Sequence, residues 1–256
     1  MLLVADVGNT KTKIGVFDGD RLVASWRLTT RREQTADEYG VFIQTLLGSR
    51  GVAARAITGI AISNVVPPVQ QALARMGEDY FGRPALFVEP DPDGYLPLAV
   101  DAPREVGPDR VVAAVAAREI HGAPVIVVDL GTATRFDCVN ARGEFVGGAI
   151  APGIAISVDA LLTRAARLSR VELTRPKEAI GRNTTTNIQS GVVFGYAGLV
   201  DGLVDRMVAE LGGEPAVVAT GGLAPLIAGV SRTIQRVDDD LKLTGLRILH
   251  ARGGLR

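Results

Sequence analysis

Two short segments of the sequence place an aspartate, a glycine and small hydroxyl residues directly after an apolar run. In the first, residues 2–5 precede Asp6, and residues 7–13 continue as VGNTKTK. A carboxylate can orient a metal ion, while glycine lets a ligand approach the backbone and short polar side chains hydrogen-bond phosphate oxygens. This combination favours a nucleotide phosphate as ligand. The same residues also fit a polar hairpin turn that binds nothing.

The second segment repeats this order later in the chain. Residues 125–129 read VIVVD and are followed by LGTAT, so that Asp129 and Gly131 lie at a constant offset of 123 residues from Asp6 and Gly8. Each acid could help to hold Mg²⁺, or it could cap nearby backbone donors. A repeat this long indicates two similar domains and not a solenoid. We therefore expect one domain over residues 1–122 and a second over residues 123–256.

Two further stretches carry candidate groups. In Gly107-Pro108-Asp109-Arg110, which opens a predicted helix, Asp109 either stabilises the helix start or acts as a general base. Arg110 is either a surface residue or an anion clamp, and spacing alone favours the structural role for both. Residues 220–222, TGG, end another predicted strand and would leave room for a nucleoside if the three turns converge on a cleft.

The phosphates would be bound by hairpin turns and not by a loop at a helix amino terminus. GNTKTKIG has the wrong spacing for a Walker A motif, and the sequence contains no GxGxxG. Lys11 and Lys13 alternate on one face of the predicted second strand and could reach a phosphate, although solvated hairpin lysines are commoner.

The remaining periodicity predicts the α/β elements that must position these groups. We expect two hairpins over residues 2–18 and 125–150, strands over residues 21–28, 56–63, 84–88 and 216–219, helices over residues 35–50, 67–81, 107–120, 154–167, 188–211 and 239–252, and loops over residues 89–104 and 182–184.

Composition excludes several classes of function. The 28 basic and 28 acidic side chains give no net charge, which offers no electrostatic attraction for nucleic acid or an anionic membrane. The single cysteine, Cys138, excludes an internal disulfide, and with only two histidines a zinc site is not expected. The start of the chain lacks a basic segment, and the weakly polar residues 145–158 are too short to cross a bilayer. We expect a cytoplasmic protein.

Six motifs in order resemble one family. They are DVGNTKTKIGVF, GPDR, DLGTATRFD, GGAIAPG, IGRNTTTNIQSG and ATGGLA, and together they closely resemble type III pantothenate kinases from about Leu2 to the end of the chain. That family belongs to the acetate kinase/sugar kinase/Hsp70/actin superfamily. The resemblance thus implies an α/β fold with two ribonuclease-H-like domains and an interdomain cleft.

The resemblance also implies an activity and its cofactors. The expected reaction is ATP-dependent phosphorylation of pantothenate to 4'-phosphopantothenate, the first step of coenzyme A biosynthesis, with Mg²⁺ and a monovalent cation, K⁺ or NH₄⁺. In this family a homodimer forms, and a residue at the position of Thr184 reaches the substrate of the partner subunit.

Matching motif residues receive roles by the same resemblance. ATP phosphates would contact Asp6, Val7, Gly8, Asn9, Thr10, Lys11, Thr12, Lys13 and Thr132. Pantothenate would contact Gly107, Pro108, Asp109, Arg110 and Thr184. Asp109 would be the general base, Asp129 would bind the monovalent cation, and Asp6 would help to hold Mg²⁺.

The sequence departs from the family pattern in two places. Residues 100–103 read VDAP where the family often has Y-x-N-P, and Arg135 replaces the small hydroxyl residue usual in DxGTATT. Two alternatives therefore stay open. One is a kinase or phosphatase of the same superfamily acting on another small substrate, and the other is a non-catalytic nucleotide-binding regulatory protein.

Overall fold

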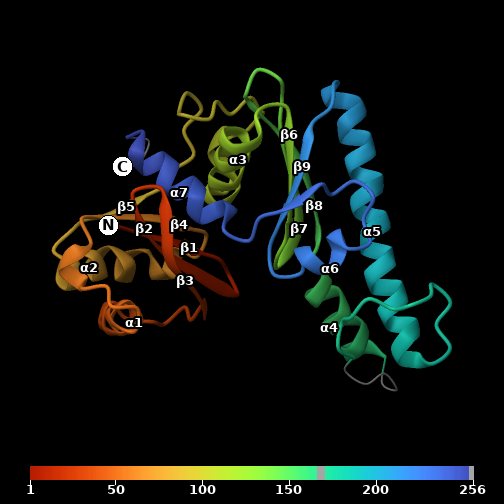
Figure 1. Ribbon diagram of the computed structural model, residues 1–256, viewed down its shortest axis with the longest axis horizontal. Helices are drawn as coiled ribbons and strands as arrows, with labels where there is room; N and C mark the ends of the chain where they lie inside the picture. Colours follow the sequence, from red (N-terminus) through yellow and green to blue (C-terminus); the bar gives the residue numbers. More distant parts are fainter. Residues whose placement is uncertain (166–170, 254–256) are drawn as a thin grey trace. The chain divides into compact units, whose positions relative to one another are not determined.

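The structure is a computed structural model that describes residues 1–165 and 171–253. The chain divides into two compact units: the first contains Met1–Ala116 and the segment from Leu241 onward, and the second contains Ala117–Asp240. In the described residues each unit is built on one five-stranded sheet (Figure 1).

The first sheet runs in the order β3-β2-β1-β4-β5. Its strands are β1 (Leu2–Val7), β2 (Lys11–Asp18), β3 (Arg21–Thr29), β4 (Gly59–Asn64) and β5 (Ala85–Phe87). β1 pairs antiparallel with β2 and parallel with β4. Helices α1 (Ala36–Gly48) and α2 (Gln70–Phe81) pack together, and their buried side chains, among them Tyr39, Ile43 and Leu73, join those of the sheet in one core. Burying these apolar faces is what holds the unit together.

The second sheet repeats this topology. Read as β8-β7-β6-β9-β10, its order matches that of the first sheet strand for strand. Its strands are β6 (Val125–Leu130), β7 (Ala133–Val139), β8 (Phe145–Pro152), β9 (Ala216–Thr220) and β10 (Arg236–Val237), and its helices are α4 (Ile154–Arg164), α5 (Thr184–Leu211) and α6 (Ala224–Ala228). α5 packs on the sheet through buried residues that include Val200 and Val204. The predicted α/β fold with two ribonuclease-H-like domains is confirmed.

The last helix does not follow the expected division at residue 122. α7 (Leu241–Ala251) packs on β1, β2 and β4 of the first unit, where Leu241, Leu243 and Leu246 are fully buried. A Cβ on Gly245 would lie 1.9 Å from the Val112 carbonyl oxygen, so this glycine allows α7 to approach the backbone of α3 (Pro108–His121). The apolar face of α7 therefore groups residues 241–253 with the first unit and not with residues 123–240.

Some predicted boundaries also differ. α5 begins at Thr184 and not at residue 188, because the side chain of Asn183 accepts a hydrogen bond from the Thr186 amide (2.9 Å) and caps the helix. Residues 54–56 form a 3₁₀ turn, like residues 67–69 and 103–105, so β4 starts only at Gly59. The helix predicted over residues 154–167 ends at Arg164, and residues 166 and 167 lie outside the described residues. None of the helices in the described ranges is long and apolar enough to span a membrane.

Candidate functional site

The first acid-tipped hairpin is present as predicted. Asp6 is buried near the end of β1, opposite Lys13 on β2, and the amide of Gly8 donates to the Lys11 carbonyl (3.0 Å) to close the turn. The hydroxyl of Thr30 donates to the Gly8 carbonyl at 2.7 Å, which ties the turn to the segment after β3. The tip of the turn, Asn9 and Thr10, is exposed. The local sequence thus forms a fixed, accessible polar loop next to a buried carboxylate.

Asp6 has a partner that no local motif indicates. The ammonium of Lys242, in the first turn of α7, lies 3.1 Å from the Asp6 carboxylate, and the two side chains are only 19% and 11% exposed. At this distance, and with little access to water, each of the two charges is stabilised by the other. Lys242 therefore belongs with the candidate site residues, and the pair couples the last helix to the hairpin.

We expect Lys242→Met to destabilise the protein, because methionine retains the packing of the side chain but leaves the Asp6 carboxylate without this cation. The free energy of unfolding should fall by about 3 kcal/mol, as for one partner removed from a buried ion pair. Chemical denaturation measures this loss. In the double variant Asp6→Asn/Lys242→Met the loss should shrink, since the carboxylate that the ammonium stabilises is removed as well; an equal or larger loss would show that the pairing is unimportant.

Mg²⁺ fits this hairpin only as an ion that arrives with its nucleotide. In the described part of the chain, no cluster of three or more His, Cys, Asp or Glu residues could form a metal cage. Mg²⁺ is commonly held by one or two carboxylates together with substrate phosphates. Because the ammonium of Lys242 already contacts Asp6, this carboxylate fits Mg²⁺ only through water, and only when nucleotide phosphates supply further negative charge.

Asp109 lies in the first turn of α3 and is buried, with 6% of its surface exposed. The carbonyl of Gly107 accepts hydrogen bonds from the amides of Arg110 (2.9 Å) and Val111 (3.2 Å), which begins the helix. A Cβ on Gly107 would lie 2.7 Å from Asp109 Oδ1, so glycine at this position leaves the space that the carboxylate occupies. The helix amino terminus favours the negative charge of Asp109. This setting suits either role predicted for it.

In the second hairpin the buried aspartate is paired with an arginine of the neighbouring strand. Asp129, on β6, lies directly opposite Arg135 on β7, and Arg135 Nη2 donates to Asp129 Oδ2 at 2.5 Å. The side chains are 3% and 16% exposed. Gly131 donates to the Ala133 carbonyl two residues on, whereas Gly8 donates to Lys11 three residues on, so this turn is one residue shorter. The shorter turn brings residue 135, not residue 136, opposite the acid.

Two of the three predicted strand-end turns meet in the second unit. Gly221 follows β9 with a φ of +99°, and a Cβ there would lie 2.7 Å from the Leu130 carbonyl carbon and 2.9 Å from Asp129 Oδ1. Thr132 is exposed at the tip of its turn, and a Cβ on Gly153 would lie 2.0 Å from the Thr132 carbonyl oxygen. Glycines on both sides thus allow close packing of the Asp129 turn.

A bound K⁺ or NH₄⁺ ion does not fit Asp129 as it is held here. A monovalent ion about 4 Å from the Arg135 guanidinium would be repelled by about 4 kcal/mol at the effective dielectric constant of a protein surface. The guanidinium already offsets the one carboxylate charge, and it stays protonated at all physiological pH values. The role that the family resemblance implies for Asp129 therefore conflicts with its contact to Arg135.

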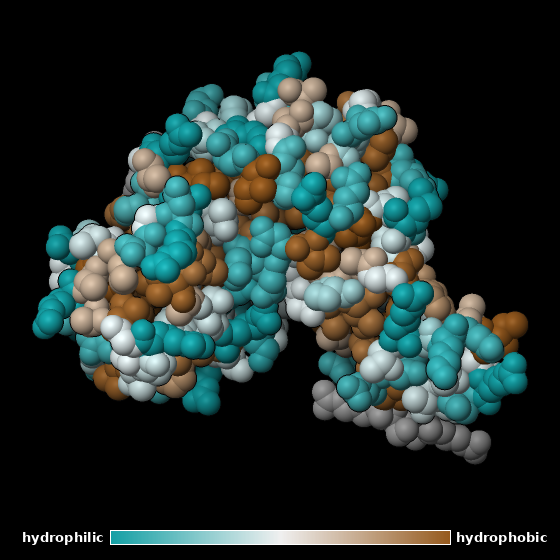
Figure 2. Space-filling model, viewed as in Figure 1, coloured by the Kyte–Doolittle hydropathy of each residue, from teal (hydrophilic) through white to brown (hydrophobic). Residues whose placement is uncertain are grey.

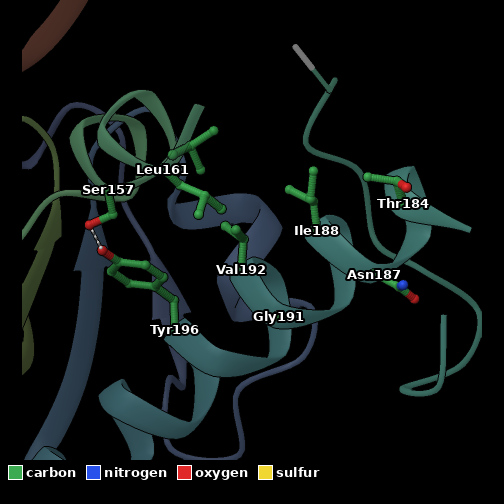
Figure 3. Close-up of a pocket in the computed structure, with 9 residues that line it drawn as sticks. Ser157, Leu161, Thr184, Asn187, Ile188, Gly191, Val192 and Tyr196 are labelled. Carbon is green, nitrogen blue, oxygen red and sulfur yellow. Dashed lines mark hydrogen bonds between the residues drawn. The ribbon is translucent and has the colours of Figure 1, made fainter. Parts of the chain in front are cut away.

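Thr184 is distant from these hairpin turns in the sequence, and it lines a cavity of the second unit. It is exposed in the first turn of α5 and borders a cavity of about 490 Å³ between α4 and α5. Figure 3 shows the apolar side chains of Leu161, Ile188 and Val192 around this space, and the hydrogen bond (2.6 Å) between Ser157 and Tyr196 at its other end. Among the described residues, none that lines this cavity is charged. An apolar cavity of this kind does not suit a phosphate.

Comparison with known proteins identifies the family. A sequence profile described as "Type III pantothenate kinase" matches residues 2–206. The chain belongs to the type III pantothenate kinase family. Type III pantothenate kinases of Myxococcus xanthus and of Anaeromyxobacter sp. strain Fw109-5 are 50% and 52% identical to it over 252 residues, covering 98% of this chain and 98% and 99% of theirs.

Solved structures agree on the fold. The ROK hexokinase of Thermus thermophilus superimposes with a TM-score of 0.50 at 17% identity, over 99% of each chain. At that identity the similarity concerns architecture alone, and it assigns this type III pantothenate kinase family member to the actin-like fold of sugar kinases.

Sequence reasoning missed two features of the family member's site. Lys242 gave no signal beyond its place at the start of a predicted helix, and its partner is far away in the sequence. Arg135 was visible as a departure from the family motif. Its pairing with Asp129 follows from hairpin register, which depends on the length of the turn.

Proposed function

We propose that this protein transfers the γ-phosphoryl group of ATP to the hydroxyl group of pantothenate, with Asp109 as the general base. Membership of the type III pantothenate kinase family, over residues 2–206 and with relatives at about half identity, carries this proposal. The buried carboxylate of Asp109 at the start of α3, in space left by Gly107, supports the assignment of the base.

Asp109 would accept the hydroxyl proton of pantothenate as the reaction proceeds. The hydroxyl oxygen then forms a bond to the γ-phosphorus, the bond from that phosphorus to the β–γ bridging oxygen breaks, and ADP leaves with the bond's electron pair. Little covalent chemistry is asked of the protein in such a transfer, so positioning and charge neutralisation dominate.

The hairpin of residues 6–13 would hold the ATP phosphates, since its exposed tip offers hydroxyl, amide and lysine donors next to Asp6. Thr132, exposed on the second hairpin, would supply a further hydroxyl contact. When bound, Mg²⁺ supplies positive charge to the phosphate oxygens. Lys13 and Lys242 would add charge from the chain itself.

Residues 107–110 would line the pantothenate pocket. Pantothenate carries a carboxylate, and the half-buried guanidinium of Arg110 is suited to pair with it in a bidentate manner. The departure at residues 100–103 lies a few residues before this helix start and would alter the same pocket.

An acceptor assay tests the proposal. ADP release should depend on pantothenate, and the product should carry the phosphate on the pantothenate hydroxyl. Equal ADP release with sugars in place of pantothenate would indicate a kinase for another small alcohol, and release without any acceptor an ATPase or phosphatase. Tight ATP binding without any turnover would indicate the non-catalytic regulatory protein.

We further propose that the protein acts as a homodimer in which Thr184 reaches the substrate of the partner subunit. One face of α5 is exposed and consists of small residues, Thr184, Asn187, Gly191, Gly195 and Gly198, and a Cβ on any of its three glycines would meet nothing within 4 Å. Large apolar side chains nearby are also exposed: Ile156 (49%), Leu161 (44%) and Ile180 (81%). In Figure 2 scattered apolar patches lie among polar surface over this end of the second unit. Such a surface suits close contact with a second copy.

Gly195→Arg should convert the dimer to a monomer and abolish most of the pantothenate turnover. A long charged side chain would occupy the face of α5 that a second subunit needs, while replacement of a helical glycine does not itself weaken the helix. Analytical ultracentrifugation and the acceptor assay measure both effects. Glu210→Arg, at the exposed carboxyl-terminal end of the same helix, is the control and should remain dimeric. A dimeric, active Gly195→Arg protein would contradict this assignment of the interface.

A further inference from the structure

The Asp129–Arg135 pair departs from the family motif and changes which cation can balance the charge of Asp129. The family resemblance implies a bound K⁺ or NH₄⁺ at Asp129, and Arg135 replaces the small hydroxyl residue usual in the family motif at this point. In this chain Arg135 Nη2 lies 2.5 Å from Asp129 Oδ2, and Asp129 is only 3% exposed. The carboxylate therefore already has a counter-charge that is covalently part of the protein.

We propose that the guanidinium of Arg135 is the resident cation of Asp129, so that pantothenate phosphorylation by this protein needs no added K⁺ or NH₄⁺. The inference rests on the proposed kinase function. A buried carboxylate requires a compensating charge, and one arginine supplies it. Arginine cannot lose its proton in a protein, so the compensation holds at any pH at which the protein works.

The pairing of strands β6 and β7 places Arg135 next to Asp129. Asp129 and Arg135 are directly opposite residues of the antiparallel β6–β7 pair, where opposite charges on one face of a sheet stabilise each other. On the other side, Gly131 and Gly221 pack close to Asp129 Oδ1, with Cβ positions that would lie 3.2 and 2.9 Å away. Oδ2 is thus held by the arginine, while Oδ1 lies next to the two turns.

In the first hairpin the charge of the buried aspartate is also balanced by a side chain of the protein, although by different residues. There Asp6 lies opposite Lys13 on β2, and the ammonium of Lys242 contacts its carboxylate at 3.1 Å. In each unit the acid at the end of the central strand is therefore matched by a cationic side chain of the chain itself. A separate cation at Asp129 would be redundant in this arrangement.

The test compares wild-type protein with Arg135→Thr, which restores a small hydroxyl residue. Both are dialysed into choline chloride and assayed with the Tris salt of ATP and MgCl₂, while KCl or NH₄Cl replaces choline at constant ionic strength up to about 100 mM. Wild-type turnover should change by less than about twofold. Turnover of Arg135→Thr should be low in choline and rise about tenfold or more in K⁺ or NH₄⁺, as an added ion takes over the place of the guanidinium.

A second readout does not depend on turnover. The melting temperature of Arg135→Thr without substrates should rise by several degrees when KCl replaces choline chloride, because an ion that binds only the folded state stabilises it. The wild-type melting temperature should not respond. Arg142→Thr is the control: it removes an exposed arginine in the turn between β7 and β8, paired with Glu144, and should behave as wild type in both measurements.

Several results would overturn the inference. They are strong activation of the wild type by K⁺ or NH₄⁺, a wild-type melting temperature that rises specifically with either ion, or an Arg135→Thr protein indifferent to both. If Arg135→Thr does not fold, the wild-type responses alone decide. Absence of pantothenate turnover in every salt would instead refute the proposed function, and the melting experiment would still test the role of Arg135.

Discussion

Asp109→Asn should retain ATP binding and lose about 10²–10⁴-fold in kcat with pantothenate, the usual contribution of a positioned general base. Asparagine has nearly the same shape, so it should occupy the space beside Gly107 that the carboxylate fills. It cannot accept a proton from the pantothenate hydroxyl. Steady-state kinetics and isothermal titration with ATP measure the two quantities separately.

The structural role of Asp109 predicts a different result. If the carboxylate only favours the amino terminus of α3, its loss removes no more than about 1 kcal/mol of stability and leaves kcat nearly unchanged. Asp79→Asn serves as a control for the loss of one negative charge in the same unit, since Asp79 is half exposed on α2 and pairs only weakly with Arg75 at 3.9 Å. A fall in melting temperature with normal kcat would remove Asp109 from the mechanism.

Local sequence patterns were sufficient where a strand or helix is defined by its own residues. The two hairpins with Asp6 and Asp129, and the helix that starts at Pro108, were predicted from apolar alternation, turn glycines and a proline in the first helical turn. The matching strand order of the two sheets supports the repeat inferred from the 123-residue offset. These features depend on contacts within or next to each segment.

The missed features depend on contacts between distant segments. The helix predicted over residues 239–252 is present as α7, but periodicity cannot tell which sheet its apolar face covers, and so neither its unit nor the Lys242–Asp6 pair could be foreseen. The early start of α5 has a local signal in the sequence. Asn183 and Thr186 form a reciprocal cap in which threonine takes the place of the usual Glu or Gln.

Arg135 illustrates a third kind of limit. Aligning the two hairpins by the offset of Asp6 and Asp129 predicts that residue 136 lies opposite the second acid, as Lys13 lies opposite the first. The shorter second turn shifts the pairing by one residue and brings Arg135 there. A one-residue change of register exchanges the faces of a strand, so the site charge could not be inferred from the repeat alone.

Gly221→Ala should cause the largest loss of stability among the glycine substitutions of this turn. Its φ of +99° is poorly accessible to alanine, and an added Cβ would approach the carbonyl carbon and oxygen of Leu130 to 2.7 Å. Backbone strain of this kind costs about 1–3 kcal/mol, and relief of the clash must also move β6 or β9. We expect the free energy of unfolding to fall by about 3 kcal/mol or more, which chemical denaturation measures.

The neighbouring Gly222→Ala separates this effect from a general sensitivity of the turn. Gly222 is exposed, and a Cβ there would meet nothing within 4 Å, so its unfolding free energy should stay within about 0.5 kcal/mol of wild type. Because the Cβ of Gly221→Ala would also lie 2.9 Å from Asp129 Oδ1, relief of that contact should displace the carboxylate from Arg135. Equal stability of the two variants would mean that the Gly221 backbone does not fix the position of Asp129.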